Sequence, residues 1–267
     1  MKNWRKYNKA LISNQPPHVE IDISDIGQKV HKGRVYFARW VTDFDSSKKT
    51  EFWYIINDTV MELDDYSKNT RSKIRRGLKH CDVRLVSRQE IIDNAYDSYY
   101  AAFMKYKTHL KCKDKTTFIR ELYDLSDEWD FWGIYHKGIL IGYSQNRVFS
   151  DCCDYSIIKF HPNFLKFYPS FALFYTMNKY YLNTKKLNYV NDGARSISHD
   201  TNIQDFLISK FKFRKAYCRM HICYHNRVNL LIKLIFPIRF ILLKLNFGIF
   251  RKLNILILQE EILRSYE

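Results

Sequence analysis

The order of strand-like and helix-like segments after residue 82 most constrains the fold of this chain. Two helical runs follow a first strand-like run, and three strand-like runs then come in series before a helix, a strand, a helix and a last strand region. In chain order these segments cover residues 83–87, 88–107, 115–127, 129–137, 139–150, 153–160, 170–183, 186–192, 199–211 and 213–225. Strands in series pair antiparallel, whereas a strand–helix–strand connection pairs them parallel. The chain is therefore predicted to be α+β, with a central mixed sheet carrying helices on both faces.

The segments on either side of this region differ from it in composition. Residues 1–18 are polar and basic and end near Pro16-Pro17, so we expect a flexible N-terminus. Strand-like runs from Val19 onward, including RVYFARWV and EFWYIIND, predict a β-rich extension over residues 19–65. The main domain is predicted over residues 66–226, and a distinct tail over residues 227–267.

The tail is densely apolar, but Lys or Arg interrupts it every five to seven residues. No run of 18 uncharged residues occurs, so a membrane-spanning helix is not predicted. Six basic residues and no acidic residue lie in residues 227–258. This pattern is typical of helices lying in a membrane interface, here broken at Pro237. Buried core or dimer helices remain an alternative.

The formal net charge of +16 points to an anionic partner, such as nucleic acid, a phosphorylated cofactor or an acidic membrane surface. A basic proteome rich in Lys, Asn, Ile and Tyr would give the same excess. The six cysteines include no CxxC pair and no Cys/His set with zinc spacing, so no metal site is predicted. The N-terminus lacks the apolar core of a secretory signal, and a reducing, cytoplasmic location is expected.

A basic helix is predicted just before the first strand of the main domain, with Ser67 as its N-cap. Arg71, Arg75 and Lys79 recur at four-residue spacing, so one side carries a row of positive charge. This row could bind phosphate groups of a nucleotide, tRNA or lipid-linked substrate, or it could be a solvated face. No nucleic-acid-binding motif accompanies it.

The segment order resembles the GNAT (N-acetyltransferase-like) fold, and the stretch IIKFHPNFLKFYPSFALFY carries that resemblance. In the family, the fourth strand leads to a glycine-rich loop whose N–H groups approach the coenzyme A pyrophosphate at a helix N-terminus. The resemblance implies that Ile158 and Phe160 on the strand contact the donor. The family's Arg and its three Gly are here replaced by Leu165, Lys166, Tyr168 and Ser170. The last three of these are the expected cofactor-binding positions, with side chains where backbone usually meets phosphate.

Two further stretches carry the resemblance, which covers roughly residues 60–225. YSKNTRSKIRRGLKHCDVRLV is similar to the start of transferase domains in the Fem-type ligase branch, which moves an aminoacyl group from tRNA to a peptidoglycan precursor. DTNIQDFLISKFKF resembles the helix before the family's last strands, with Ile208 where a tyrosine general acid often stands. That tyrosine role is therefore not expected here.

The resemblance implies an acyltransferase of the divergent Fem-like branch. The expected donor is an acyl-CoA such as acetyl-CoA, and the expected acceptor is an amine or hydroxyl of a sugar or cell-envelope precursor, lipid-linked precursors included. An aminoacyl-tRNA-dependent transferase is one alternative. A catalytically degenerate, membrane-associated binding module is the other, favoured by the missing glycines.

Three residues are candidate catalytic groups, each with a structural alternative. Asp192 follows a strand at the sheet edge where α/β ligands sit, but could be a turn residue before Gly193. His199 could be a base, or could simply precede a helix start. His161 ends the fourth strand and could be a turn residue. Ser196, between Asp192 and His199, is a candidate substrate or phosphate contact.

Overall fold

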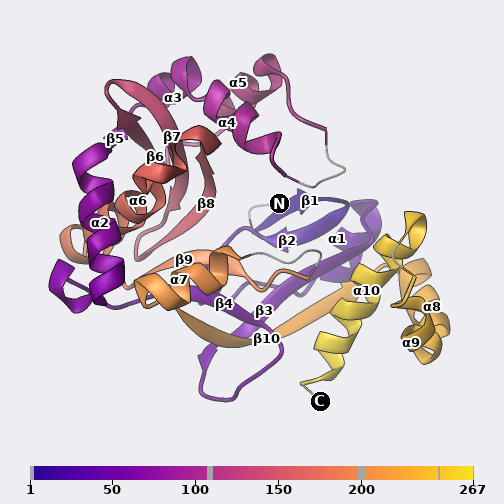
Figure 1. The fold of residues 1–267 in the computed structure, drawn as a ribbon. Helices are drawn as coiled ribbons and strands as arrows, with labels where there is room; N and C mark the ends of the chain where they lie inside the picture. Colours follow the sequence, from indigo (N-terminus) through magenta and orange to yellow (C-terminus); the bar gives the residue numbers. More distant parts are fainter. Residues whose placement is uncertain (1–2, 107–110, 198–201, 246, 267) are drawn as a thin grey trace. The chain divides into compact units, whose positions relative to one another are not determined.

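The structure is a computed structural model that describes residues 3–106, 111–197, 202–245 and 247–266 (Figure 1). The chain divides into two compact units, each assembled from separated stretches of sequence. Unit 1 comprises Met1–Tyr54, Ala194–Asn202 and Lys215–Glu267, and unit 2 comprises Ile55–Gly193 and Ile203–Arg214. The predicted N-terminal extension and the predicted tail thus contribute to the same unit.

Unit 2 is built on a mixed sheet with the strand order β9-β8-β7-β6-β5. These strands are β5 (Asp82–Val86), β6 (Trp129–His136), β7 (Ile139–Val148), β8 (Cys152–Phe160) and β9 (Tyr189–Ala194). The strands from β5 to β8 pair antiparallel, and Lys137 and Gly138 turn the chain between β6 and β7 with positive φ. The β8 and β9 strands pair parallel, because a helical connection joins them. The predicted mixed sheet is confirmed.

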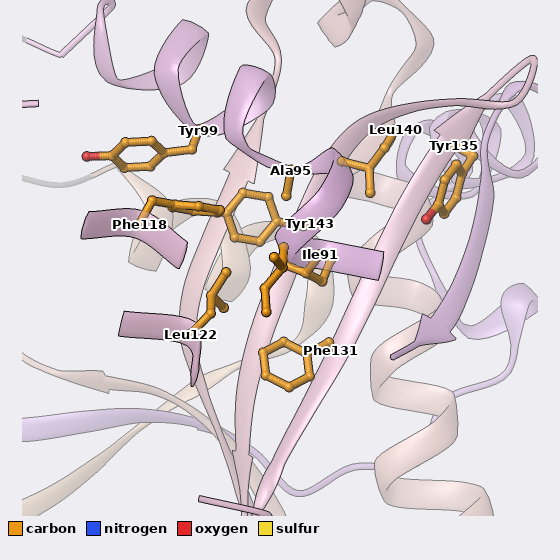
Figure 2. Packing of buried hydrophobic residues seen from close by; sticks show 10 residues of the cluster. Ile91, Ala95, Tyr99, Phe118, Leu122, Phe131, Tyr135, Leu140 and Tyr143 are labelled. Atoms are coloured by element: carbon orange, nitrogen blue, oxygen red, sulfur yellow. The ribbon is translucent and has the colours of Figure 1, made fainter. Parts of the chain in front are cut away.

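Helices cover both faces of this sheet, as predicted. They are η1 (Leu63–Asp65), α2 (Lys68–His80), α3 (Arg88–Asn94), α4 (Tyr96–Phe103), α5 (Lys115–Tyr123), η2 (Pro162–Phe167), α6 (Pro169–Asn178), the π-helical η3 (Lys179–Thr184) and α7 (Ile203–Phe211). Figure 2 shows one interface, where Tyr99 of α4 and Phe118 and Leu122 of α5 pack with Phe131 and Tyr143 of the strands. Successive strand residues point to opposite faces, so alternate positions supply this cluster.

Two long helices predicted from the sequence are shorter in the structure. The helix predicted over 88–107 is divided at Ala95, which ends α3 and precedes α4. The helix predicted over 170–183 stops at Asn178 and continues as a π-helical turn. Apolar spacing alone does not distinguish one helix from two that cover the same surface.

The opposite face of the sheet contains a buried polar network centred on the Tyr181 hydroxyl. Trp132 Nε1 donates to this hydroxyl at 2.9 Å, and Asn146 Nδ2 donates to it at 3.3 Å. The hydroxyl in turn donates to Asp130 Oδ2 at 3.0 Å. Tyr181 and Asn146 are both fully buried, so these groups depend on one another for hydrogen bonds.

Removal of this hydroxyl should destabilise the fold. In Tyr181→Phe, the buried donors of Trp132 and Asn146 lose their shared acceptor, and we expect the free energy of unfolding to fall by about 1–3 kcal/mol. Chemical denaturation measures this change. The neighbouring Tyr180→Phe is the matched control, since no hydrogen bond involves the Tyr180 hydroxyl within the described chain. Equal stability of the two variants would contradict the prediction.

Unit 1 contains four neighbouring strands in the order β1-β2-β3-β10. The strands are β1 (Trp4–Tyr7), β2 (Ala10–Ser13), β3 (Phe37–Ser46) and β10 (Arg214–Tyr224), and β4 (Trp53–Asn57) begins in unit 1 and ends in unit 2. The pairs β1–β2 and β3–β10 are antiparallel, and β2–β3 is parallel.

The N-terminal part of unit 1 differs from its sequence-based expectation. A hairpin occupies the segment predicted to be flexible, because Trp4 and Leu11 pack with Val30 and Ala38 in an apolar cluster. The other residues of this segment are mostly polar, so its composition did not predict that it packs into a core. No strand forms over residues 19–23, within the described chain, and helix α1 (Ile26–Lys32) follows instead.

The tail is helical and belongs to unit 1. Its elements are α8 (Asn226–Ile235), η4 (Phe236–Ile238), α9 (Arg239–Leu242) and α10 (Gly248–Arg264), and the predicted break falls at Pro237 in η4. The α10 helix is held to the strands by two hydrogen bonds: Arg39 Nη1 donates to Gln259 Oε1 at 3.1 Å, and the Tyr224 hydroxyl donates to Glu260 Oε2 at 3.0 Å. None of the helices in the described ranges has the length and apolar character to cross a membrane.

Candidate functional site

The parallel strands β8 and β9 separate partway along their length. They are paired only from Cys152 opposite Tyr189 to Asp154 opposite Asn191, although β8 continues to Phe160. Beyond that point β8 stays paired with β7 on its other side. One edge of β8 from Tyr155 onward is therefore not paired with β9, and Asp192 lies at the start of this separation.

The amides of Ile158 and Phe160 point toward this unpaired edge. The His161 N–H donates to the Ile141 carbonyl on β7 at 2.8 Å. Because hydrogen-bonding direction alternates along an antiparallel strand, the amides of residues 159 and 157 also face β7. Those of Ile158 and Phe160 then face away from β7, and neither has an acceptor among the residues that the structure describes. The two strand positions expected to contact a donor carry these free amides.

A β-bulge lies between these amides and Asp192. Tyr155 is opposite Asn146 and Ile157 is opposite Gln145, so Ser156 is an extra residue in β8. A bulge bends its strand and increases the local twist. The bend occurs next to the last β8–β9 pair, where it turns β8 away from β9.

Asp192 is a half-buried carboxylate with no charged partner among the described residues. In the described ranges, no hydrogen bond or ion pair reaches its side chain. The turn that follows depends on Asn191 instead: its Oδ1 accepts from the Gly193 N–H at 2.8 Å, and Gly193 has a φ of 100°. Such turns are usually stabilised by a side-chain oxygen that accepts a hydrogen bond from the backbone N–H two residues later. Asn191, and not Asp192, therefore has the turn-forming role considered for Asp192.

Burial raises the pKa of Asp192 from its ordinary value of 3.8 to about 7. An isolated carboxylate surrounded by protein loses hydration that no other group replaces, so its neutral form is favoured. The Asp192 charge also acts on Tyr155, whose own pKa is raised chiefly by burial. A carboxylate that titrates near neutral pH can both accept and release a proton under physiological conditions.

A second polar group lies beneath the same strands. The Tyr155 hydroxyl donates to Asn178 Oδ1 at 2.8 Å, and Asn178 is 4% exposed. The buried Asn178 Nδ2 makes no hydrogen bond of ordinary geometry in the described part of the chain, but the Asn178 side chain also interacts with Tyr66. Tyr155 thus links β8 to a buried polar group on the helix below it.

The turn after β8 leads into α6 through a left-handed residue. His161 begins η2 and its Nδ1 accepts from the Asn163 N–H at 3.3 Å, so this ring nitrogen has a structural task. Tyr168 has a φ of 58° and precedes α6. Its carbonyl accepts from the Phe171 and Ala172 N–H groups at 3.1 and 3.3 Å. Pro169 has no N–H, so few backbone donors remain at this helix start; Ser170 supplies one.

The basic helix α2 packs directly against this turn. A Cβ on Gly77 would lie 2.7 Å from the Tyr168 carbonyl oxygen, so only glycine allows this approach. The Arg76 guanidinium lies over the Tyr168 ring at 4.8 Å, and the Lys73 ammonium lies 5.4 Å from the Phe171 ring centre. These two cations are therefore beside the start of α6.

The row of cations predicted from the sequence lies elsewhere on the same helix. Arg71 and Arg75 face Asp64, at 3.1 and 3.7 Å, and Lys79 is exposed. Lys73 and Arg76 fall outside the four-residue spacing and were not among the predicted site residues. The signal that could have identified them is Gly77 within a helix, because a helical glycine often marks a close contact.

The other predicted site residues are placed as follows. Lys166 is exposed on η2, with its ammonium 5.3 Å from the Phe167 ring centre. Ser196 is in unit 1, half-buried and next to Arg195, which pairs with Glu51 at 2.7 Å. His199 lies outside the described residues. The structure thus brings Asp192, Ile158 and Phe160 to one pair of strands, and Tyr168 and Ser170 to the helix start that follows.

Comparison with known proteins identifies the fold. No family model and no curated protein matches the chain. Among solved structures, FemX is similar over 87% of this chain and 85% of its own, with a TM-score of 0.61 and 12% identity. The C-terminal domain of a putative lysylphosphatidylglycerol synthetase from Agrobacterium fabrum (TM-score 0.57, 11% identity) covers 87% and 82%. L-PGS from Bacillus licheniformis (TM-score 0.52, 10% identity) covers 87% and 84%. The chain therefore has the divergent Fem-like, GNAT-like fold that its segment order predicted.

Proposed function

We propose that this protein is a transferase that moves an acyl group onto an amine or hydroxyl at the β8–β9 separation. The observation that carries this proposal is Asp192, a carboxylate with a pKa raised by burial to about 7 and with no partner among the described residues, at the point where two parallel strands part. Such a group suits a general base. The free amides of Ile158 and Phe160 further along β8 suit the binding of a donor's carbonyl and amide groups.

In the proposed reaction, the Ile158 N–H donates a hydrogen bond to the acyl carbonyl oxygen and stabilises the negative charge that develops on it. Asp192 accepts the proton of the acceptor amine or hydroxyl as its nitrogen or oxygen attacks the carbonyl carbon. The bond from that carbon to the carrier's sulfur or oxygen then breaks, and the carrier leaves with the proton held by Asp192. His161 and His199 are secondary candidates for the proton transfer.

We propose an acyl-CoA donor, with Lys73, Arg76 and Ser170 beside its phosphates. The helix start offers few backbone donors, so side-chain cations from α2 would replace the usual glycine loop. Lys166 and Tyr168 line the same turn. The cations of the outer row, Arg71, Arg75 and Lys79, would extend this positive surface.

An aminoacyl-tRNA donor is the second candidate. The observation that favours it is the same scarcity of backbone donors at the start of α6, because a coenzyme A pyrophosphate normally depends on them. A basic helix can hold a nucleic acid backbone without such donors. The similarity to FemX in fold is compatible with either donor.

The donor experiment compares acetyl-CoA and aminoacyl-tRNA binding by calorimetry at two salt concentrations. Lys73→Gln/Arg76→Gln should lower the affinity for the donor by roughly 10–100-fold, because each lost charge-assisted contact contributes about 1–1.5 kcal/mol to binding. Lys111→Gln/Lys115→Gln makes the same charge change at exposed positions and should leave binding unchanged.

Each donor has its own contradicting outcome. Absence of acetyl-CoA binding up to millimolar concentration would remove coenzyme A as donor. Binding of tRNA that does not weaken with salt would remove tRNA, since phosphate contacts always respond to counterions. A protein that binds either donor but transfers nothing would be the third possibility, a binding module.

The acceptor we propose is an amine or hydroxyl of a sugar or cell-envelope precursor, reached on a lipid carrier. The protein would then work as a peripheral protein on the inner face of the membrane. The similar fold of the putative lysylphosphatidylglycerol synthetase domain is consistent with a lipid-associated acceptor. Detection of acyl transfer to a panel of amino sugars and lipid-linked sugars tests the acceptor class.

A further inference from the structure

The outward side of the tail helices carries a set of large apolar side chains in contact with water. We call this set the tail surface: Leu230, Leu234, Ile238, Phe240, Ile241 and Phe247. Each is between 50% and 67% exposed. Single exposed apolar residues are common, but a contiguous group of this kind on a folded protein marks an interaction site.

Leu230 and Leu234 are four residues apart on α8, so they form an apolar stripe on one side of that helix. Ile238, Phe240 and Ile241 continue the exposed apolar set in η4 and α9. The opposite side of α8 is already used, since Ile232 is 2% exposed. The stripe is thus additional to the core of unit 1.

The side chains that pack the tail against unit 1 determine which side faces outward. Arg239 Nε donates to Glu261 Oε1 at 3.1 Å, and the Arg264 guanidinium lies 3.9 Å from the Phe236 ring centre. These contacts join η4 and α9 to α10, which hydrogen bonds attach to β3 and β10. The stripe is therefore presented by helices that are held in place.

Positive charge dominates around the tail surface. The sequence from 226 to 258 has no Asp or Glu, and the acids that follow, Glu260 and Glu261, are paired with Arg264 and Arg239. Exposed cations flank the stripe, and none of them forms an ion pair in the described chain: Arg227, Lys233, Lys244, Arg251 and Lys252. A partner must accept apolar side chains at its surface and offer negative charge around them. The interface of a bilayer with anionic lipids has both properties.

We infer that the tail surface docks this protein on an anionic membrane. The apolar side chains enter the boundary between headgroups and acyl chains, and the flanking cations contact lipid phosphates. A second copy of the chain is a poorer occupant, because a twofold interface would place the same unpaired cations opposite one another. The inference does not depend on the proposed chemistry at Asp192.

The test is co-sedimentation of the full chain with vesicles of phosphatidylcholine alone and with 30% phosphatidylglycerol added. We expect binding to the anionic vesicles that weakens at high salt. Leu230→Glu/Leu234→Glu should reduce this binding by about 20-fold or more, and Lys233→Gln/Lys244→Gln by about 20-fold on anionic vesicles only. Tyr123→Glu/Ile139→Glu is the control, with side chains 57% and 60% exposed in unit 2.

A second readout separates docking from misfolding. The chain has five tryptophans, so quenching by brominated lipids is measured relative to the wild type. Phe240→Trp should add fluorescence that these lipids quench, whereas Tyr123→Trp should add fluorescence that they do not quench. Equal binding to neutral and anionic vesicles, unchanged binding of the Leu230 and Leu234 variant, or a stable dimer in light scattering without vesicle binding would each overturn the inference. Thermal midpoints of all variants should match the wild type, since every changed position is exposed.

Discussion

Asp192→Asn is expected to lower kcat for acyl transfer by about 10²–10⁴-fold while the protein stays folded. A positioned general base contributes this much to a reaction that requires proton removal in its transition state. Asparagine has nearly the same shape, so it should fit the same half-buried position on β9. Initial rates with the donor that binds in calorimetry measure the loss. Asp205→Asn on α7 is the matched control, an exposed acid in the same unit.

The same substitution should stabilise the protein at neutral pH. The pKa of Asp192 is about 7 in the folded protein and has its ordinary value of 3.8 when unfolded, so the folded state holds more protons between these values. The free energy of unfolding of the wild type therefore falls as pH rises from about 4 to 7 and is constant above. Asp192→Asn lacks this decline. It should match the wild type near pH 4 and exceed it by up to about 4 kcal/mol at pH 8.

Activity should have the opposite pH dependence. The proposed base works only when ionised, so kcat/KM should rise with pH up to about 7 and then level off. A gain in stability together with a loss of turnover is the signature of a strained functional group, whereas a purely structural carboxylate would lose both. Unchanged turnover in Asp192→Asn would show that Asp192 is not the base, whereas donor binding without turnover in the wild type would support the binding module.

The sequence predicted the sheet because local patterns specify strands and their connections. Three strand-like runs in series and a later strand–helix–strand connection sufficed for the pairing of unit 2. Asp192 was singled out as a candidate because the end of a strand is where α/β sites lie, and its role stays a prediction. Its altered pKa was not predictable, because burial depends on residues from other elements.

Tertiary contacts explain why two sequence-based predictions, the cation row of α2 and the flexible N-terminus, differ from the structure. A four-residue spacing identified Arg71 and Arg75, but the face of α2 that meets α6 is set by Gly77 and holds Lys73 and Arg76. The hairpin of β1 and β2 has few apolar residues, and only their shared packing with α1 and β3 makes them a core. Helix or strand patterns within one segment contain no information on these partners.

The Ile158 backbone amide gives the sharpest test of how β8 acts. Ile158→Pro removes one N–H that points away from β7, so it should preserve the β7–β8 ladder. We expect kcat to fall by about 10²–10³-fold, the usual effect of losing one donor to a developing oxyanion. Ile158→Ala keeps the amide and removes most of the side chain, so it should retain most activity.

A third variant checks the direction of the amide independently of activity. Lys159→Pro removes an N–H that faces β7, and it should lower the free energy of unfolding by about 3 kcal/mol or more through loss of a ladder hydrogen bond and steric conflict. If Ile158→Pro is destabilised as much as Lys159→Pro, the amide of residue 158 belongs to the ladder and not to the donor. If Ile158→Pro is stable but fully active, the unpaired edge of β8 does not hold the acyl carbonyl, and Asp192 would have to act with a different oxyanion donor. Stability and turnover together therefore distinguish a structural strand edge from a catalytic one.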